Sequence, residues 1–225
     1  MAIKSRINSY LPTDPIGKNN RVEQILTHVP KDAAILDIGC VNHKLNNDDE
    51  NWLHGRLCNI SDDVVGLDFL EDEIEMMDEM GYDVICANAE QFDLDRKFDV
   101  IVAGELLEHL SNPGEFLERA NSHLEEGGKL IVSTPNPWYL FHVLAVYTEI
   151  AQWNEEHTAW FDEIVLKELL RRHDFDVETV DYVKPSPWKW PFVHKNLERL
   201  IVFIFRMFGI EAAGGNRLVV VAGEI

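Results

Sequence analysis

Positive charge is scarce in this chain. Its 225 residues include 40 aspartates and glutamates but only 20 lysines and arginines, which gives a formal net charge of −20. No cluster of lysine and arginine interrupts this acidic composition. Because such a surface repels phosphate groups, we expect no nucleic-acid partner. Proteins that stay soluble in concentrated salt carry acidic surfaces of this kind, so a halophilic source is one hypothesis for this chain.

Cysteine is also scarce. The three cysteines, Cys40, Cys58 and Cys86, do not have the spacing of a metal site, so the simple interpretation is a reduced cytoplasmic protein. The first fifteen residues contain no apolar core segment, so we expect no signal peptide there. With 46% hydrophobic residues the chain can bury a substantial core, and we expect a single domain over residues 1–225.

Glycine is missing where a dinucleotide site needs it. Two apolar runs, AILDIGC at 34–40 and VVGLD at 64–68, are typical of buried parallel strands. Ligands of such sheets bind beyond the carboxyl ends, so Asp37 and Asp68 should border one crevice, with Asp68 placed to accept the hydroxyls of a ribose. A pyrophosphate site requires the pattern G-x-G-x-x-G, but here Gly39 stands alone. The runs therefore predict a nucleoside site without a phosphate cradle, which disfavours a dehydrogenase.

Several segments, in order along the chain, resemble the motifs of class I S-adenosylmethionine-dependent methyltransferases. They are ILDIGC, VVGLD, CANAEQFDL (86–94), FDVIVAGELLEHL (98–110) and GGKLIVSTPNP (127–137). The resemblance covers roughly Ile25 to Ile225 and implies an α/β fold. We expect a Rossmann-like, seven-stranded, mostly parallel sheet with helices on both faces and an antiparallel last strand. The resemblance also implies an enzyme with S-adenosylmethionine as its cofactor.

The resemblance places the cofactor against residues at the ends of the first four strands. These residues are Asp37, Gly39, Cys40, Asp68, Phe69, Asn88, Ala89, Glu90 and Glu105. The chain departs from the family in two places. Val41 and His43 stand where the family usually has glycines, and Asn88 stands where an aspartate is usual. Asn88 can still accept a hydrogen bond from the adenine amino group through its amide oxygen.

Apolar periodicity predicts alternating strands and helices. The expected strands cover residues 33–38, 64–67, 83–86, 98–103, 129–133, 175–183 and 217–222. The expected helices cover residues 20–29, 70–80, 113–124 and 162–173, together with a short helix that presents Trp52, Leu53 and Leu57 on one face. In the helix at 70–80, we expect Ile74, Met77 and Met80 to pack on the sheet.

The segment ELLEH carries most of the chemistry. On a helical turn Glu105, Glu108 and His109 would project together, and His157 would join them from a later loop. Some family members with this pattern, acting on catechols or on a terminal ribose, bind a divalent metal there. Such a site is an alternative here, but it is not the favoured one. The favoured role is that of general base for His109 or His157, and a purely structural role is the third possibility. Asn136 would offer its amide to the acceptor or simply mark a turn.

Two apolar insertions, at about residues 138–160 and 185–213, are expected to form a substrate lid. The apolar stretch Leu200 to Ile210 is too short to cross a bilayer. The alternatives are a buried helix that closes the domain, a homodimer contact, and a surface for peripheral contact with the inner face of a membrane.

The expected acceptor is an oxygen, in a hydroxyl or a carboxylate, of a small or lipid-linked molecule. Similarity to methyltransferases of polysaccharide and glycolipid assembly favours a sugar or a uronic acid. A quinone or catechol is the alternative acceptor. The alternative to an enzyme is a scaffold protein that binds S-adenosylmethionine and does not catalyse a reaction.

The acidic surface gives a first prediction. If the charge reflects adaptation to salt, the melting temperature should rise steeply between low and molar KCl, because added ions screen the repulsion among carboxylates. Thermal unfolding at increasing KCl measures this, and a flat response would contradict the halophilic hypothesis.

Overall fold

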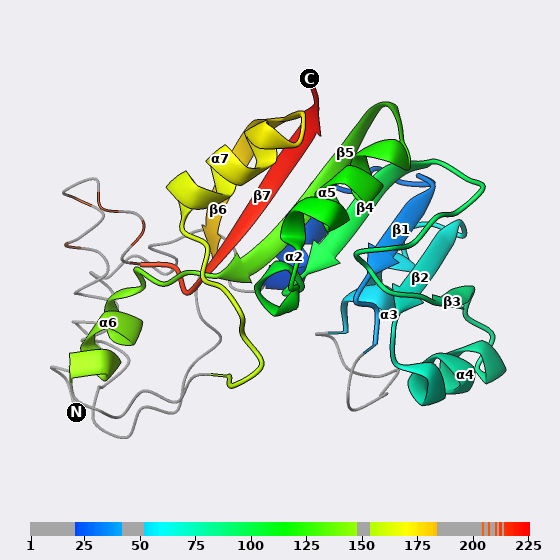
Figure 1. Cartoon of the computed structure of the whole chain (residues 1–225), viewed down its shortest axis with the longest axis horizontal. Helices are drawn as coiled ribbons and strands as arrows, with labels where there is room; N and C mark the ends of the chain where they lie inside the picture. Colours follow the sequence, from blue (N-terminus) through cyan, green and yellow to red (C-terminus); the bar gives the residue numbers. More distant parts are fainter. Residues whose placement is uncertain are drawn as a thin grey trace, which may run out of the picture.

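The computed structural model describes residues 21–41, 52–147, 154–183 and 214–225, together with the single residues 204, 207, 210 and 212. Its strands form a seven-stranded sheet in the order β3-β2-β1-β4-β5-β7-β6. They are β1 (Ile35–Ile38), β2 (Val64–Asp68), β3 (Val84–Cys86), β4 (Phe98–Gly104), β5 (Leu124–Pro135), β6 (Phe175–Val183) and β7 (Arg217–Glu224). β7 runs antiparallel to both β5 and β6, whereas the other neighbours are parallel. The expected Rossmann-like sheet with an antiparallel last strand is confirmed (Figure 1).

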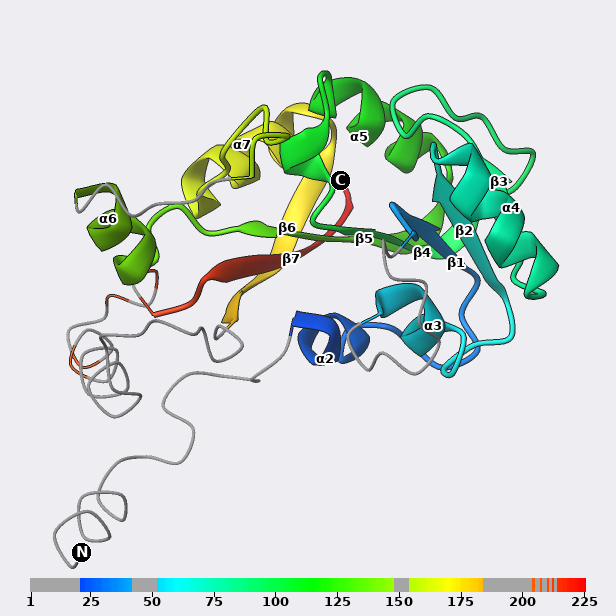
Figure 2. The same ribbon diagram turned by 90° about the horizontal axis from the view of Figure 1, so that it is seen from below.

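Helices cover both faces of the sheet, as expected (Figure 2). One face carries α2 (Arg21–Leu26) and α3 (Leu53–Leu57). The same face carries α4 (Glu71–Glu79), whose Ile74 and Met77 pack with Trp52, and the other face carries α5 (Pro113–Ser122) and α7 (Glu163–Arg172). The short 3-10 helix η1 (Leu107–His109) follows β4, and α6 (Leu140–Tyr147) follows β5. β1 and β4 are neighbours although β2 and β3 separate them in the sequence, so the strand order reverses between them. Ligands of open α/β sheets bind at such a reversal.

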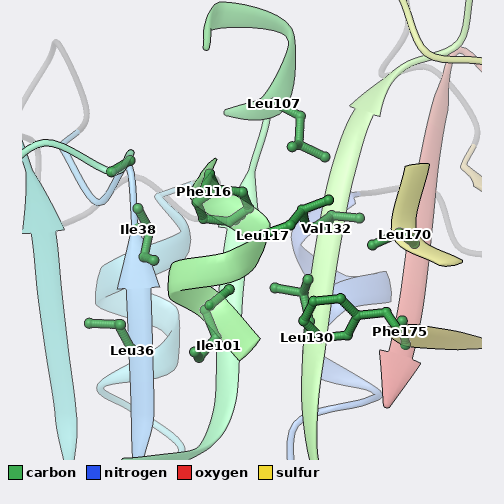
Figure 3. Packing of buried hydrophobic residues seen from close by; sticks show 14 of the residues in the cluster. Leu36, Ile38, Ile101, Leu107, Phe116, Leu117, Leu130, Val132, Leu170 and Phe175 are labelled. Atoms are coloured by element: carbon green, nitrogen blue, oxygen red, sulfur yellow. The ribbon is translucent and has the colours of Figure 1, made fainter. Parts of the chain in front are cut away.

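Alternation along the central strands divides the core into two layers. In β1, Leu36 and Ile38 join the cluster beneath α5 and α7, whereas Ile35 joins the cluster beneath α2 and α3. In β4, Ile101 faces the first cluster and Val102 the second. Figure 3 shows the first cluster, in which side chains from α5 and α7 meet those of the strands. Successive side chains of a strand point to opposite faces, so the side chain of Asp37 is directed to the α2 and α3 side.

The boundary between α5 and β5 differs from the prediction. The helix ends at Ser122 and β5 already begins at Leu124, whereas the sequence pattern predicted a strand from residue 129. Leu124 pairs with Phe98 and Lys129 with Val100, so the four residues 125–128 stand opposite the single residue Asp99 of β4. Gly127 accommodates this bulge with a φ of +77°.

Two further expectations are tested by burial. Trp52, Leu53 and Leu57 are buried, as the short-helix pattern predicted. Met77 is also buried, but Met80 is 41% exposed because α4 ends one residue before it, so its expected packing on the sheet was wrong. Of the predicted lid, residues 148–153, 185–203, 205, 206, 208, 209, 211 and 213 lie outside the described residues. Within the part that is described, no helix is both long and apolar enough to cross a membrane.

The core beneath α5 gives a stability prediction. Phe116 of α5 is 0% exposed and belongs to this cluster, so Phe116→Ala should lower the free energy of unfolding by about 3–5 kcal/mol, through lost burial and a residual cavity. Urea unfolding measures the change. Glu115→Ala, an exposed position on the same helix, is the control and should change stability by less than about 0.5 kcal/mol. Equal effects of the two substitutions would contradict this packing.

Candidate functional site

The turn after β4 separates Glu105 from the rest of the ELLEH segment. β4 ends at Gly104, and Glu105 has a φ of +58°, a conformation that is uncommon for a residue with a side chain. Its backbone N–H donates to the Ser133 carbonyl oxygen at 2.9 Å. Its Oε2 accepts a hydrogen bond from Arg217 Nε at 2.7 Å, within an ion pair between β4 and β7. Glu105 therefore faces Arg217. The spacing had suggested that Glu105, Glu108 and His109 share one helical face, and this expectation was wrong for Glu105.

Glu108 is a buried carboxyl group with one unused oxygen. Its residue is 1% exposed, and Thr134 Oγ1 donates to its Oε2 at 3.1 Å. Its Oε1 is also buried but has no hydrogen-bond partner among the described residues. Burial, with a further contribution from the negative charge of Glu105, raises the pKa of Glu108 to about 8. Without a cation beside it, this group therefore carries a proton at neutral pH.

Glu108, His109 and His157 form a compact cluster of potential ligands. Each offers an atom that lies within 4.8 Å of the others. The His109 and His157 rings are nearly perpendicular, with centroids 4.7 Å apart. Burial, and then the neighbouring His109, lower the pKa of His157, and its Nδ1 is buried without a hydrogen-bond partner in the described part of the chain. One carboxylate oxygen and two imidazole nitrogens suit a divalent transition metal, and the same groups can also accept a proton.

His157 reaches the cluster because Thr158 fastens its loop to η1. The Thr158 N–H donates to the Glu108 carbonyl oxygen at 2.8 Å, and Thr158 Oγ1 donates to the Leu110 carbonyl oxygen at 2.7 Å. The sequence had suggested His157 as a fourth metal ligand, and the structure places His157 beside Glu108 and His109. Three of the four proposed ligands come together, and Glu105 lies apart with Arg217.

The carboxyl ends of β1 and β2 bring Gly39 and Asp68 to neighbouring turns. Gly39 has a φ of +80°, which glycine adopts without strain, and its N–H donates to the Leu67 carbonyl oxygen at 2.8 Å. The two oxygens of Asp68 accept hydrogen bonds from Val41 N at 3.1 Å and from Phe69 N at 2.8 Å. Phe69 is 71% exposed at this edge. The structure thus assembles these predicted cofactor residues, whose contacts with the cofactor remain predictions.

The predicted adenine segment makes a tight turn. Asn88 Oδ1 accepts a hydrogen bond from Glu90 N at 2.8 Å, and Ala89 is buried. Glu90 Oε1 accepts a hydrogen bond from Asn112 N at 2.7 Å, at the start of α5, so this carboxylate fixes the entry to the helix. One lone pair of the Asn88 amide oxygen therefore already has a protein donor.

In Cys40 the backbone carbonyl group forms a hydrogen bond, whereas the side chain is a protonated thiol. Its carbonyl oxygen accepts a hydrogen bond from Trp52 Nε1 at 3.0 Å. Burial, followed by the negative charges of Asp37 and Asp68, raises the pKa of the Cys40 thiol, which therefore stays protonated.

Asn136 requires a correction. The sequence suggested that its amide faces the acceptor, but the residue is 1% exposed. Its Nδ2 donates to the carbonyl oxygens of Ala212 and Gly215, both at 2.6 Å, and its Oδ1 accepts from Trp138 N at 3.0 Å. Both amide hydrogens are therefore used to hold the chain before β7, which matches the alternative that Asn136 stabilises a turn.

Sequence reasoning missed three polar side chains near the site. Arg21 donates from Nη1 to Ser133 Oγ at 3.2 Å and lies beside Gly104, where a Cβ atom would be 2.5 Å from that nitrogen. Arg217 pairs with Glu105, and His54 pairs with Asp37. Arg21 and Arg217 reach partners 112 residues away, so no local pattern could reveal them.

Known proteins provide an independent comparison. A family model described as a methyltransferase domain matches residues 16–180. A ubiquinone biosynthesis O-methyltransferase of Nitrobacter winogradskyi is 33% identical over 96 residues, covering 42% of this chain and 37% of that protein. A protein of the same name from Bradyrhizobium diazoefficiens is 27% identical over 169 residues, covering 72% of this chain and 64% of that protein. The matches thus span from about a third to less than two thirds of the length of these relatives.

A solved structure shows the same fold. The crystal structure of a SAM-dependent methyltransferase from Archaeoglobus fulgidus matches with a TM-score of 0.58 and 19% identity. The match covers 98% of this chain and 92% of that chain.

The burial of Glu108 predicts a pH dependence of stability. Its pKa is about 8 in the folded protein, against an ordinary value of 4.5 for a glutamate, so its favourable contribution is complete below pH 4.5 and is lost as the pH rises through 8. Glu108→Gln should remove this loss. Between pH 5.5 and 8.5 the ion-free variant should lose less free energy of unfolding than the ion-free wild type, by on the order of 2 kcal/mol.

Urea unfolding in EDTA at the two pH values measures the difference. Glu115→Gln, an exposed glutamate, is the control and should keep the pH dependence of the wild type. Identical pH dependence in the wild type and Glu108→Gln would show that the carboxyl group is not held protonated.

Proposed function

This chain belongs to the family of S-adenosylmethionine-dependent methyltransferase domains, and we propose that it methylates a phenolic oxygen of a quinone-type acceptor. The observation that carries the proposal is the cluster of Glu108, His109 and His157 at the carboxyl end of β4. The curated relatives named above are O-methyltransferases, which supports oxygen as the methylated atom.

Methyl transfer from a sulfonium requires alignment and an acceptor oxygen without its proton. His157 can remove that proton, because burial and His109 lower its pKa and keep the imidazole neutral at pH 7. Glu108 is protonated there and adds no negative charge that would oppose formation of a phenolate. In this role the cluster is a general base in a partly dry site.

A divalent cation is the second role that the same residues support. The unused, buried Glu108 Oε1 and His157 Nδ1 are vacant donor atoms of the type that such a cation binds. Glu108, His109 and His157 would hold it, and it would lower the pKa of an acceptor hydroxyl. Glu105 would not be a ligand of this cation, because it forms an ion pair with Arg217.

A row of aromatic rings favours a planar acceptor. From His157 the row continues to Trp160, with centroids 5.6 Å apart, and then to His142 at 6.5 Å. It ends at α6, where apolar side chains are exposed: Leu144, Val146 and Tyr147. An aromatic head beside the histidines with an apolar tail along α6 would match this arrangement. The sugar or uronic acid expected from the sequence finds no support among the named relatives.

The proposal predicts the product of a defined assay. We would incubate the protein with methyl-labelled S-adenosylmethionine and either a prenylated ortho-dihydroxybenzoate or glucuronic acid, and identify products by mass spectrometry. The phenolic acceptor should gain one methyl group on oxygen. His157→Ala should lower kcat by about 10²–10⁴-fold, the usual contribution of a positioned acid or base. His173→Gln, a partly exposed histidine that pairs with Glu118 outside the site, is the control.

EDTA and added Mg²⁺, Mn²⁺ or Zn²⁺ separate the two roles of the cluster. Activity that persists in EDTA supports the general base, whereas loss in EDTA with recovery on adding one cation supports the metal. Methylation of glucuronic acid alone would overturn the quinone-type proposal.

A further inference from the structure

A buried charged pair lies beneath the predicted cofactor loop. Asp37 is 1% exposed at the carboxyl end of β1, and His54 of α3 is 0% exposed. His54 Nδ1 lies 3.1 Å from Asp37 Oδ2. The alternation of β1 explains the pair, because it directs residue 37 to the face that α3 covers. The second Asp37 oxygen, Oδ1, is buried without a hydrogen-bond partner among the described residues.

The pair joins α3 to β1, two residues before the loop of residues 39–41. A second contact reaches the loop itself, because Trp52 Nε1, in the residue before α3, donates to the Cys40 carbonyl oxygen at 3.0 Å. Trp52 and His54 are adjacent rings, with centroids 5.8 Å apart, so the two contacts form one packed unit. On its other side the loop is held by the hydrogen bond from Val41 N to Asp68 Oδ2. The loop is therefore clamped between α3 and β2.

The loop that these contacts hold, residues 39–41, contains a single glycine, Gly39. After Gly39 and Cys40 the chain continues with Val41, a β-branched residue. A loop built from such residues cannot adopt every conformation that glycine permits, so it depends more on contacts that select one conformation. α3 provides those contacts.

Negative charge is concentrated around the loop. Asp37 and Asp68 approach it from β1 and β2, and both raise the pKa of the Cys40 thiol in addition to the effect of burial. Among the described residues near this loop, His54 is the group that can supply a compensating positive charge. Removing one partner of a buried ion pair is strongly destabilising because it leaves the other charge uncompensated.

His54 can hold that charge over the physiological range. Burial opposes its protonation, but the hydrogen bond and charge of Asp37, together with the neighbouring Cys58, raise the pKa of His54 to about 9. Its contribution is therefore complete below pH 6.5 and is lost as the pH rises through 9. The other titratable groups against it are Cys40 and Tyr82, whose pKa values burial raises, and Cys58 at the end of α3.

We propose that His54 is a positioning residue for the cofactor: its charged bridge to Asp37 holds residues 39–41 in the conformation that binds S-adenosylmethionine. The inference rests on the proposed function only in that it concerns the cofactor side of the same site. It requires neither the acceptor nor a metal.

The test is calorimetric titration with S-adenosylhomocysteine between pH 7 and 10. The key variant is His54→Asn, whose amide nitrogen occupies the place of Nδ1 and keeps a donor toward Asp37 without the charge. At pH 7.5 this variant should bind about tenfold more weakly than the wild type. Wild-type affinity should fall with an inflection near pH 9 that His54→Asn lacks. The amino group of the ligand titrates equally in both proteins, so the difference between the curves reports on His54.

Two controls complete the design. Glu115→Gln, at an exposed position on α5, should keep the inflection, and His173→Gln should bind as the wild type does. Histidine-ring NMR of the wild type measures the His54 titration directly and needs no variant that folds.

The outcomes separate the inference from the proposed function. Equal affinity of His54→Asn and the wild type at every pH would overturn the inference, as would weaker binding with the inflection retained or a His54 ring that titrates below pH 7. If the wild type itself bound no S-adenosylhomocysteine, the cofactor assignment and the inference would both fail. Normal binding in the wild type without methylation of any phenol would contradict the proposed acceptor alone.

Discussion

The parallel pairing of β1 with β4 is the constraint on which the site depends. Ile38 lies opposite Ala103, so the chain leaves the two strands at the same level of the sheet. Both exits turn through positive φ, at Gly39 and at Glu105. The turns are close enough that a Cβ on Gly39 would lie 3.4 Å from Leu106 Cδ1. The predicted cofactor loop and the segment proposed to meet the acceptor are thereby neighbours, as transfer of a methyl group between two bound molecules requires.

Two of the carboxyl groups buried at this edge of the sheet, those of Asp37 and Glu108, are stabilised in opposite ways. Asp37 has an imidazole partner, and the pKa of His54 is raised, so the pair is charged. Glu108 accepts a hydrogen bond from the hydroxyl of Thr134, and burial with the charge of Glu105 raises its pKa, so the group is neutral. The positive charge of Arg217 opposes this rise of the pKa but does not cancel it. The cofactor side therefore has fixed charge, whereas the acceptor side has groups that can gain or lose a proton.

The sheet and the half-site on β1 and β2 could be predicted because they follow from local patterns. Continuous apolar runs gave β1 and β2, and the aspartate at each carboxyl end followed from strand direction. Other features depend on contacts that no local pattern contains. Glu105 leaves the predicted helical face because its backbone takes a positive φ and Arg217, 112 residues away, binds it. Asn136 is buried because the chain before β7 supplies carbonyl oxygens for its amide. The early start of β5 depends on a bulge that only pairing with β4 defines.

The acceptor side is assembled by segments from the second half of the chain. Thr158 fastens His157 to η1, Asn136 ties the end of β5 to residues before β7, and Arg217 holds Glu105. These links join segments that are distant in the sequence, and none of the three involves β1 or β2. The matching family model covers residues 16–180, which include β1 to β6 in part or in full and also His157, but not Arg217. Under the proposed function, the contacts that position His157, Trp160 and α6 select the acceptor.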